Sequence, residues 1–168
     1  EGPSGPRQSG QQLGIDVDRA TCVDNIRRIL EPASRTGFFV RIDMENSAYT
    51  ERTLEIFETL WEQEYRNLGV ALQAYLYRTE KDVHRMNDLG ARVRLVKGAY
   101  LEPPNVAYPA KADVDANYLK LATRLLQPDN MKPGALLHIA THDLVIQEKL
   151  QQVIAERPTW DEEQIAQQ

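Results

Sequence analysis

The chain has 168 residues, of which 42% are hydrophobic and 27% are charged, a composition typical of one globular domain with a substantial core. The formal net charge of −5 gives no electrostatic footprint for nucleic acid, so we expect no nucleic-acid partner. No apolar run approaches the ~20 residues that span a bilayer, and no signal-peptide pattern is present. The single cysteine, Cys22, excludes an internal disulfide, and we expect a reducing, cytoplasmic location.

In chain order, residues 1–12 are rich in Gly, Ser, Pro and Gln and predict a flexible tail, either a linker or the remnant of a tag. Residues 13–168 predict one domain in which helices and strands alternate. Apolar residues recur at helical spacing in Thr21–Leu30, in Thr50–Tyr65, after Thr79 as far as Gly90, in Asp113–Leu126, and from Asp143 to about Ala155. Pro32 is expected to stop or kink the first helix, and Thr79 is expected to cap the third.

Apolar segments between these helices predict strands, namely Phe38–Glu45, Val70–Tyr77, the first part of Ala91–Tyr100, and Ala135–Asp143. Strand–helix units in series favour parallel strands joined by right-handed crossovers. A doubly wound sheet and part of a (βα)8 barrel both fit this pattern. The sequence contains neither the Gly-rich turn of a dinucleotide-binding fold nor a P-loop.

Polar residues on these strands indicate where a site lies. Arg94 falls near the end of its strand, and a buried arginine needs an anionic or polar partner. Gly98 follows directly and lets a ligand or another backbone segment approach closely. Further polar residues share one parity near the other strand ends, namely Asp43, Glu45, Gln73, Tyr75, Thr141 and His142. Barrel enzymes place their chemistry at this C-terminal rim, so we predict a functional site there.

Other chemistries have weaker support in the sequence. His138 and His142 share a parity, but on an extended strand they lie about 13 Å apart, too far to share a zinc ion. No glycine-flanked serine provides the nucleophile elbow of a Ser–His–Asp hydrolase. We therefore expect no metal site, and we expect His138 to be a buried strand residue.

Five collinear motifs resemble flavin-dependent proline dehydrogenase of the single-function bacterial type. They are RIDME (Arg41–Glu45), LQAYLYRTE (Leu72–Glu80), VRLVKGAY (Val93–Tyr100), KADVDANY (Lys111–Tyr118) and ATHD (Ala140–Asp143). Each motif alone is modest, but five in order are specific. The resemblance implies a distorted (βα)8 barrel with FAD across the C-terminal ends of its strands. It also implies hydride removal from L-proline to give Δ1-pyrroline-5-carboxylate, and reoxidation of the flavin by a membrane quinone.

The resemblance implies roles for single residues as well. In the catalytic positions, Asp43 organises the proline pocket, Arg94 hydrogen-bonds near flavin N5, and Tyr100 forms a wall of the pocket. The implied cofactor-binding residues are Gln73 and Arg94 at the isoalloxazine, Val96, Lys97, Gly98 and Ala99 beside the flavin and its ribityl chain, Lys111 toward the FAD phosphates, and Thr141 and His142 at the last strand tip.

The chain also departs from the family pattern. A (βα)8 barrel needs about 250 residues, whereas this sequence predicts about four βα units. A lysine-bearing strand is expected just before Leu13, where the sequence reads SGQQ, and the arginine-paired helix that holds the proline carboxylate has no counterpart. We therefore expect the flavin-binding half of a barrel with little or no activity on its own. Self-association through open sheet edges and peripheral contact with the inner membrane are further options.

Two alternatives stay open. One is a non-catalytic barrel fragment that acts as an interaction module and binds no flavin; the colour of the purified protein separates it from a flavoprotein. The other is a different flavin- or phosphate-binding barrel enzyme, similar to methylenetetrahydrofolate reductase, which substrate specificity would distinguish.

Overall fold

The structure, a computed structural model, describes residues 8–9, 13–127, 132 and 134–156. The other residues of the predicted tail, most of the turn predicted over 128–134 and the polar segment 157–168 lie outside the described residues. The chain divides into two compact units, an N-terminal unit of residues 1–71 and a C-terminal unit of residues 72–168. The sequence predicts a single partial-barrel domain over residues 13–168.

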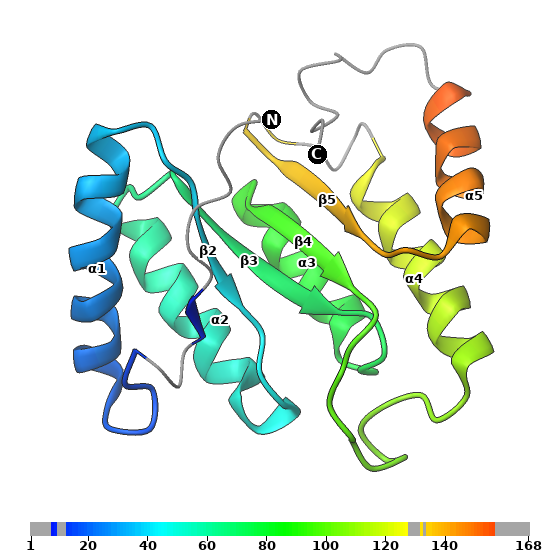
Figure 1. The fold of residues 1–168 in the computed structure, drawn as a ribbon, viewed down its shortest axis with the longest axis horizontal. Helices are drawn as coiled ribbons and strands as arrows, with labels where there is room; N and C mark the ends of the chain where they lie inside the picture. Colours follow the sequence, from blue (N-terminus) through cyan, green and yellow to red (C-terminus); the bar gives the residue numbers. More distant parts are fainter. Residues whose placement is uncertain (1–7, 10–12, 128–131, 133, 157–168) are drawn as a thin grey trace. The chain divides into compact units, whose positions relative to one another are not determined.

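In the N-terminal unit, parallel strands alternate with helices (Figure 1). Its elements are β1 (Gln8–Ser9), α1 (Arg19–Arg35), β2 (Val40–Asp43), α2 (Ser47–Glu62) and the first part of β3 (Leu68–Gln73), a strand that crosses the boundary. β2 pairs in parallel with β1, where Gln8 lies opposite Ile42, and with β3, where Val40 lies opposite Leu68. Two residues of the segment predicted as a flexible tail therefore form a strand beside β2.

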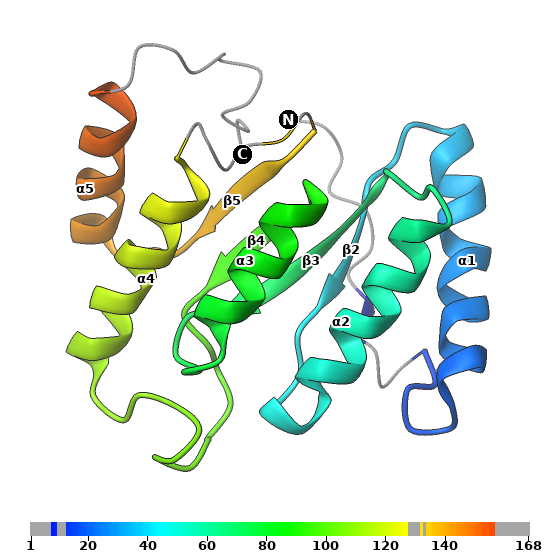
Figure 2. The same ribbon diagram turned by 180° about the vertical axis from the view of Figure 1, so that it is seen from behind.

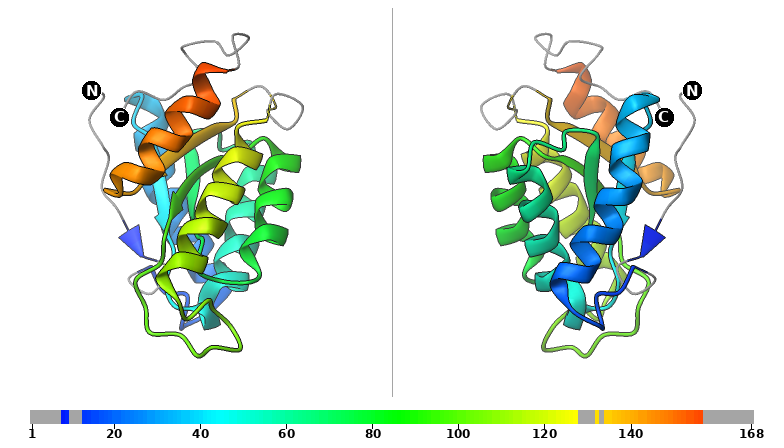
Figure 3. Two further views of the ribbon diagram at one scale, coloured as in Figure 1. Left: turned by 90° about the vertical axis from the view of Figure 1, so that its right-hand side faces the viewer. Right: turned by 90° about the vertical axis from the view of Figure 1, so that its left-hand side faces the viewer.

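The core of the N-terminal unit comes from the apolar faces that the sequence predicts. α1 packs beside α2 and against β2, and Figure 3 shows the two helices side by side. Cys22 and Leu30 of α1 are fully buried, and burial raises the pKa of the Cys22 thiol, as expected for a small buried hydrophobe. On α2, Phe57 stacks on Trp61 with ring centroids 5.4 Å apart.

The C-terminal unit repeats the strand–helix alternation. Its elements are the end of β3, α3 (Thr79–Leu89), β4 (Arg92–Val96), α4 (Lys111–Leu125), β5 (Leu136–Ala140) and α5 (Leu144–Ala155). β4 and β5 pair in parallel along their whole length. α4 packs against both strands and lies between α3 and α5, and Figure 2 shows α3 and α4 on one face of β4 and β5. The predicted parallel α/β class is confirmed.

The predicted parity of β4 is confirmed too. Val93 and Leu95 are buried, whereas Arg92, Arg94 and Val96 on the opposite parity are half-buried. Tyr118 of α4 lies beneath this strand, and its hydroxyl donates a hydrogen bond to the Leu95 carbonyl at 2.9 Å. Burial raises the pKa of Tyr118, so the phenol stays protonated and remains a donor.

Two expectations about helix ends are wrong, a stop of α1 at Pro32 and Thr79 as the N-cap of α3. α1 does not stop at Pro32 but continues to Arg35. Pro32 is exposed in the last turn, and the carbonyl that it deprives of a donor belongs to the exposed Arg28, where water can replace the missing bond.

The N-cap position of α3 is occupied by Arg78 and not by Thr79 as predicted. Thr79 is the first helical residue rather than the N-cap, because its hydroxyl donates to the Gln73 carbonyl instead. Two other predicted helix ends are confirmed. Gly90 ends α3 with φ 69°, and Asp143 caps α5 by accepting hydrogen bonds from the amides of Val145 and Ile146.

We predict that Tyr118→Phe lowers the free energy of unfolding by about 1–2 kcal/mol, because the buried Leu95 carbonyl loses its side-chain donor. Urea unfolding measures the change. Tyr65→Phe is the matched control, since that exposed hydroxyl lies 3.4 Å from Glu31 in a long and weak contact. Equal losses in the two variants would contradict the assignment.

Candidate functional site

The predicted rim is built where β3, β4 and β5 of the C-terminal unit end. Gln73 is the last residue of β3, and its side chain is 3% exposed. Its amide oxygen has no hydrogen-bond partner among the residues that the structure describes. An acceptor buried without a donor costs about 1–3 kcal/mol, so such atoms mark places where an outside group belongs. Gln73 is therefore the strongest single indication of a ligand site in the unit.

Gly98 lies in the segment after β4 and has φ 118°, a region that other residues rarely adopt. A Cβ atom at this position would lie 2.3 Å from the ring of Tyr75. The close approach that the sequence predicts at Gly98 is therefore made by a side chain of the same unit. Burial, reinforced by the negative charge of Glu102, raises the pKa of Tyr75 to about 12, so this ring packs in its neutral form.

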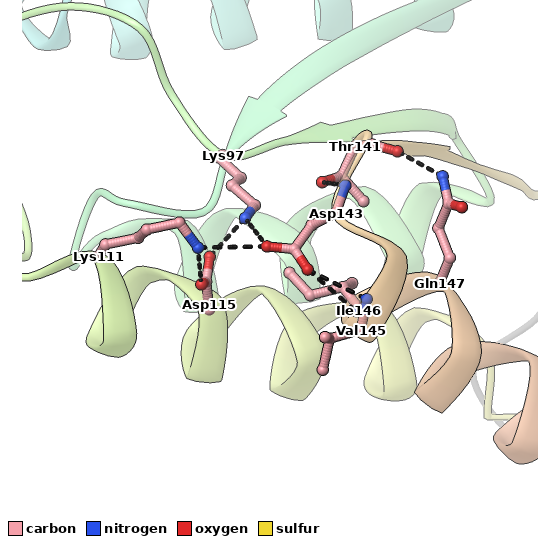
Figure 4. A network of polar contacts seen from close by, with 8 residues as sticks. All are labelled: Lys97, Lys111, Asp115, Thr141, Asp143, Val145, Ile146 and Gln147. Atoms are coloured by element: carbon pink, nitrogen blue, oxygen red, sulfur yellow. Dashed lines mark hydrogen bonds and ion pairs between the residues drawn. The ribbon is translucent and has the colours of Figure 1, made fainter.

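A cluster of two lysines and two aspartates lies beside this segment (Figure 4). Lys97 donates to Asp115 at 2.5 Å and to Asp143 at 2.8 Å. Lys111 binds the same two carboxylates, with Asp143 at 3.2 Å. Each aspartate thus lies between two cations, which lets two ammonium groups stay close together without net repulsion.

The charges in this cluster stabilise one another. Hydrogen bonds from Lys97 and then Lys111 hold the pKa of Asp143 far below its usual range. The same lysines, with Lys111 first, lower the pKa of Asp115, and Asp115 followed by Asp143 raises the pKa of Lys111. All three groups are therefore ionised at neutral pH.

The tip after β5 is held by its own hydrogen bonds. The Asp143 amide donates to the Thr141 hydroxyl at 3.1 Å, and Gln147 of α5 donates to the Thr141 carbonyl at 2.7 Å. Asp143 also caps α5, so a single carboxylate connects the lysine cluster to the helix that follows.

The structure brings most of the predicted site residues into the C-terminal unit. Arg94 lies on β4 opposite His138, which is half-buried rather than buried as predicted. Lys111 is the first residue of α4, and the other predicted residues of this unit are at the strand ends and in the loops that follow, namely Gln73, Val96, Lys97, Gly98, Ala99, Tyr100, Thr141 and His142. Ala99, Tyr100 and His142 are exposed there, whereas Asp43 ends β2 in the N-terminal unit.

Sequence reasoning missed Asp115 entirely and assigned Asp143 only as a helix cap. One signal was available, because Asp115 follows Lys111 by four residues on a predicted helix, and residues at that spacing face each other. Nothing in the sequence indicates that Lys97, on another element, joins the same pair.

The residues at the rim fit a flavin. The isoalloxazine ring carries an N–H donor between two carbonyl acceptors, and the unpartnered Gln73 oxygen needs such a donor. Arg94 adds a guanidinium on the neighbouring strand. Lys97 and Lys111 each use two of three ammonium donors within the cluster, which leaves one for a phosphate oxygen.

Comparison with known proteins gives the family. A family model described as proline dehydrogenase matches residues 3–168. The chain belongs to the proline dehydrogenase family. It is 42% identical over 131 residues to proline dehydrogenase 2 of Bacillus subtilis (strain 168), covering 78% of this chain and 41% of that protein. It is 41% identical over 140 residues to proline dehydrogenase of Deinococcus radiodurans, covering 83% of this chain and 41% of that protein. The chain thus spans less than half the length of these relatives.

Solved structures support the fold. Proline utilization A from Bdellovibrio bacteriovorus, inactivated by N-propargylglycine, matches 89% of this chain and 18% of its own with a TM-score of 0.78 at 24% identity. Proline utilization A from Bradyrhizobium japonicum also matches 89% of this chain and 18% of its own, with a TM-score of 0.77 at 19% identity. The chain therefore has the strand–helix arrangement of the barrel in these proteins, which confirms the predicted partial (βα)8 fold.

We predict that Gly98→Ala lowers the free energy of unfolding by about 2–5 kcal/mol, because it combines an unfavourable φ with a collision against the Tyr75 ring. Gly37→Ala is the matched control. It has φ 73° but no atom within 4 Å of the added Cβ, so it should cost only about 1–2 kcal/mol. Similar losses at the two glycines in urea unfolding would show that the ring contact is unimportant.

We predict that Asp143→Asn lowers the free energy of unfolding near neutral pH and has a smaller effect in acid. Asparagine still caps α5, so the variant removes mainly the charge. Because the pKa of Asp143 is depressed in the folded state, its contribution is fully present above the unfolded pKa of about 3.9 and is lost as pH falls through the folded value. The stability gap between the original chain and the variant should therefore be widest near neutral pH and shrink below about pH 4.

Urea unfolding across this pH range measures the gap. Asp113→Asn, at an exposed position in the first turn of α4, is the control. Its difference in unfolding free energy from the original chain should change little with pH. A gap for Asp143→Asn that is constant from neutral to acidic pH would contradict the ion-pair account.

Proposed function

We propose that this chain provides the flavin-binding residues for FAD-dependent oxidation of L-proline to Δ1-pyrroline-5-carboxylate. The observation that carries the proposal is the buried, unpartnered amide oxygen of Gln73 at the end of β3, in a chain of the proline dehydrogenase family. An acceptor in this state needs a donor from outside the described residues, and a flavin supplies one.

A bound flavin would supply the redox chemistry, as acceptor of the hydride from a carbon–hydrogen bond next to the proline nitrogen; the nitrogen loses a proton, and the carbon–nitrogen bond becomes double. The protein supplies orientation and charge. Arg94 provides a fixed positive charge that stabilises negative charge developing nearby, and such preorganised donors are often the largest catalytic contribution. Gln73 fixes one edge of the ring, and the segment Val96–Ala99 follows it along the backbone.

Lys97 and Lys111 are proposed to hold the phosphate end of FAD. Lys111 suits this role because its side chain is 73% exposed and keeps a free donor beyond Asp115 and Asp143. Thr141 and His142 are proposed as further flavin contacts. Asp43 and Tyr100 are proposed for the proline pocket, where Asp43 orients the pocket and Tyr100 forms part of its wall.

A quinone is the proposed electron acceptor. Among the described residues, no helix is both long enough and apolar enough to cross a membrane. In this proposal, transfer to a quinone brings the protein surface into transient contact with the bilayer.

The first test is titration of the purified chain with FAD, followed by flavin fluorescence. We predict saturable quenching, and a Kd at least about tenfold higher for Arg94→Ala, the loss expected when a charged hydrogen bond disappears. Arg92→Ala is the matched control, since Arg92 lies on the same face of β4 at the opposite end and should change the Kd by less than about twofold.

The outcomes separate the alternatives. Absence of saturable binding by the unsubstituted chain would contradict the proposal and favour a non-catalytic interaction module. Equal weakening by both arginine substitutions would remove Arg94 from the site. With flavin bound, anaerobic addition of L-proline, compared with L-alanine, tests the substrate through loss of the visible flavin absorbance.

A further inference from the structure

The KADVDANY motif does more than provide Lys111. The whole motif lies on α4, and its second half sends three polar side chains toward the strand ends. Asp115 binds Lys97, the Asn117 amide donates to the Ala74 carbonyl at 2.7 Å, and the Tyr118 hydroxyl donates to the Leu95 carbonyl at 2.9 Å. Of the residues bound by these three side chains, Ala74, the partner of Asn117, directly follows Gln73 in the sequence.

The backbone of Gln73–Tyr75 is held from three elements at once. The Gln73 carbonyl accepts from the Thr79 hydroxyl of α3, and the Ala74 carbonyl accepts from Asn117 of α4. The Tyr75 carbonyl accepts from the amide of Tyr108 in the loop before α4, at 2.8 Å. Three consecutive carbonyls thus have three donors from different parts of the unit.

The opposite side of this segment is bound to the end of β4. The amides of Ala74 and Tyr75 donate to the carbonyls of Val96 and Lys97, each at 2.8 Å. Every polar backbone group from the Gln73 carbonyl to the Tyr75 carbonyl therefore has a partner, although the regular strand β3 has already ended at Gln73. The atoms of this segment left without a partner among the described residues are on side chains, the Gln73 amide oxygen and the Tyr75 hydroxyl.

We propose that Asn117 is a positioning residue that fixes the Gln73 side chain for flavin binding by holding the Ala74 carbonyl. The inference rests on the proposed function. Asn117 is 8% exposed, so water cannot readily replace its amide if it is removed. The peptide unit between Ala74 and Tyr75 would then be held only through its amide, which donates to the Lys97 carbonyl, and it shares the Cα atom of Ala74 with the peptide that follows Gln73. A shift there moves Gln73 relative to β4.

Asn117→Leu removes the donor at similar volume. Asn67→Leu is the matched control, because the Asn67 amide makes the same kind of bond, to the carbonyls of Leu30 and Phe38 at 3.3 Å, at the start of β3 rather than its end. Urea unfolding is measured first, so that both variants are compared under conditions where each is folded.

Amide hydrogen exchange in the flavin-free chain gives the first readout. For Asn117→Leu we expect the Ala74 and Tyr75 amides to exchange at least about tenfold faster than in the original chain, because local opening of this segment becomes easier. Asn67→Leu should leave both amides unchanged. Equal acceleration in the two variants would reduce Asn117 to a general stabilising residue and overturn the inference.

FAD titration gives the second readout. We expect Asn117→Leu to raise the Kd by at least about tenfold and to shift the visible spectrum of the bound flavin, whereas Asn67→Leu should stay within about twofold. Asn117→Asp adds a pH test. An ionised carboxylate only accepts hydrogen bonds, whereas a protonated one can donate. The Kd of Asn117→Asp for FAD, relative to that of the original chain, should therefore decrease as pH falls.

The inference and the proposed function fail differently. An unchanged Kd and spectrum for Asn117→Leu, with flavin still bound by the original chain, would overturn the inference alone. Absence of flavin uptake by the original chain would contradict the proposed function and remove this extension with it.

Discussion

In the C-terminal unit, the backbone leaves regular sheet pairing at the ends of β3 and β4, and every polar group released there needs a new partner. Unpaired backbone groups away from water are costly, so the segments beyond the strands depend on side chains from elsewhere. α4 provides them. Asn117 and Tyr118 bind carbonyls of the strand ends, and Asp115 binds the side chain of Lys97. The conformation of the rim is therefore decided largely by one helix.

The lysine–aspartate cluster adds an electrostatic constraint to this arrangement. Lys97 and Lys111 come from different elements, and ammonium groups this close would repel one another without Asp115 and Asp143 between them. Asp143 also caps α5, so the segment after β4, the start of α4 and the start of α5 share one set of charges. A positively charged ligand group has little to gain here, whereas the remaining ammonium donors suit an anion.

The sequence was informative where the pattern is local. Alternation along β4 predicted which of its residues are buried, and Gly98 was predicted to permit a close approach. It was misleading where local rules compete. Pro32 is tolerated because it falls in the exposed last turn of α1, and Thr79 gives up its capping role to bind the Gln73 carbonyl.

Contacts between distant residues could not be predicted. Asn117 and Ala74 are separated by 43 positions, and no periodicity connects them. Nor could the sequence show that the Gln73 oxygen has no partner, since that depends on the packing of every neighbouring side chain. These tertiary features carry the proposal that the rim binds a flavin.

The most direct measurement of the central claim is a map of amide hydrogen exchange along the chain, with and without FAD. We predict that FAD slows exchange in the segments that follow the strands of the C-terminal unit, namely residues 73–75, 96–99 and 141–143, and leaves α1 of the N-terminal unit unchanged. Slowing confined to α1 and α2, or absent from these three segments, would contradict it.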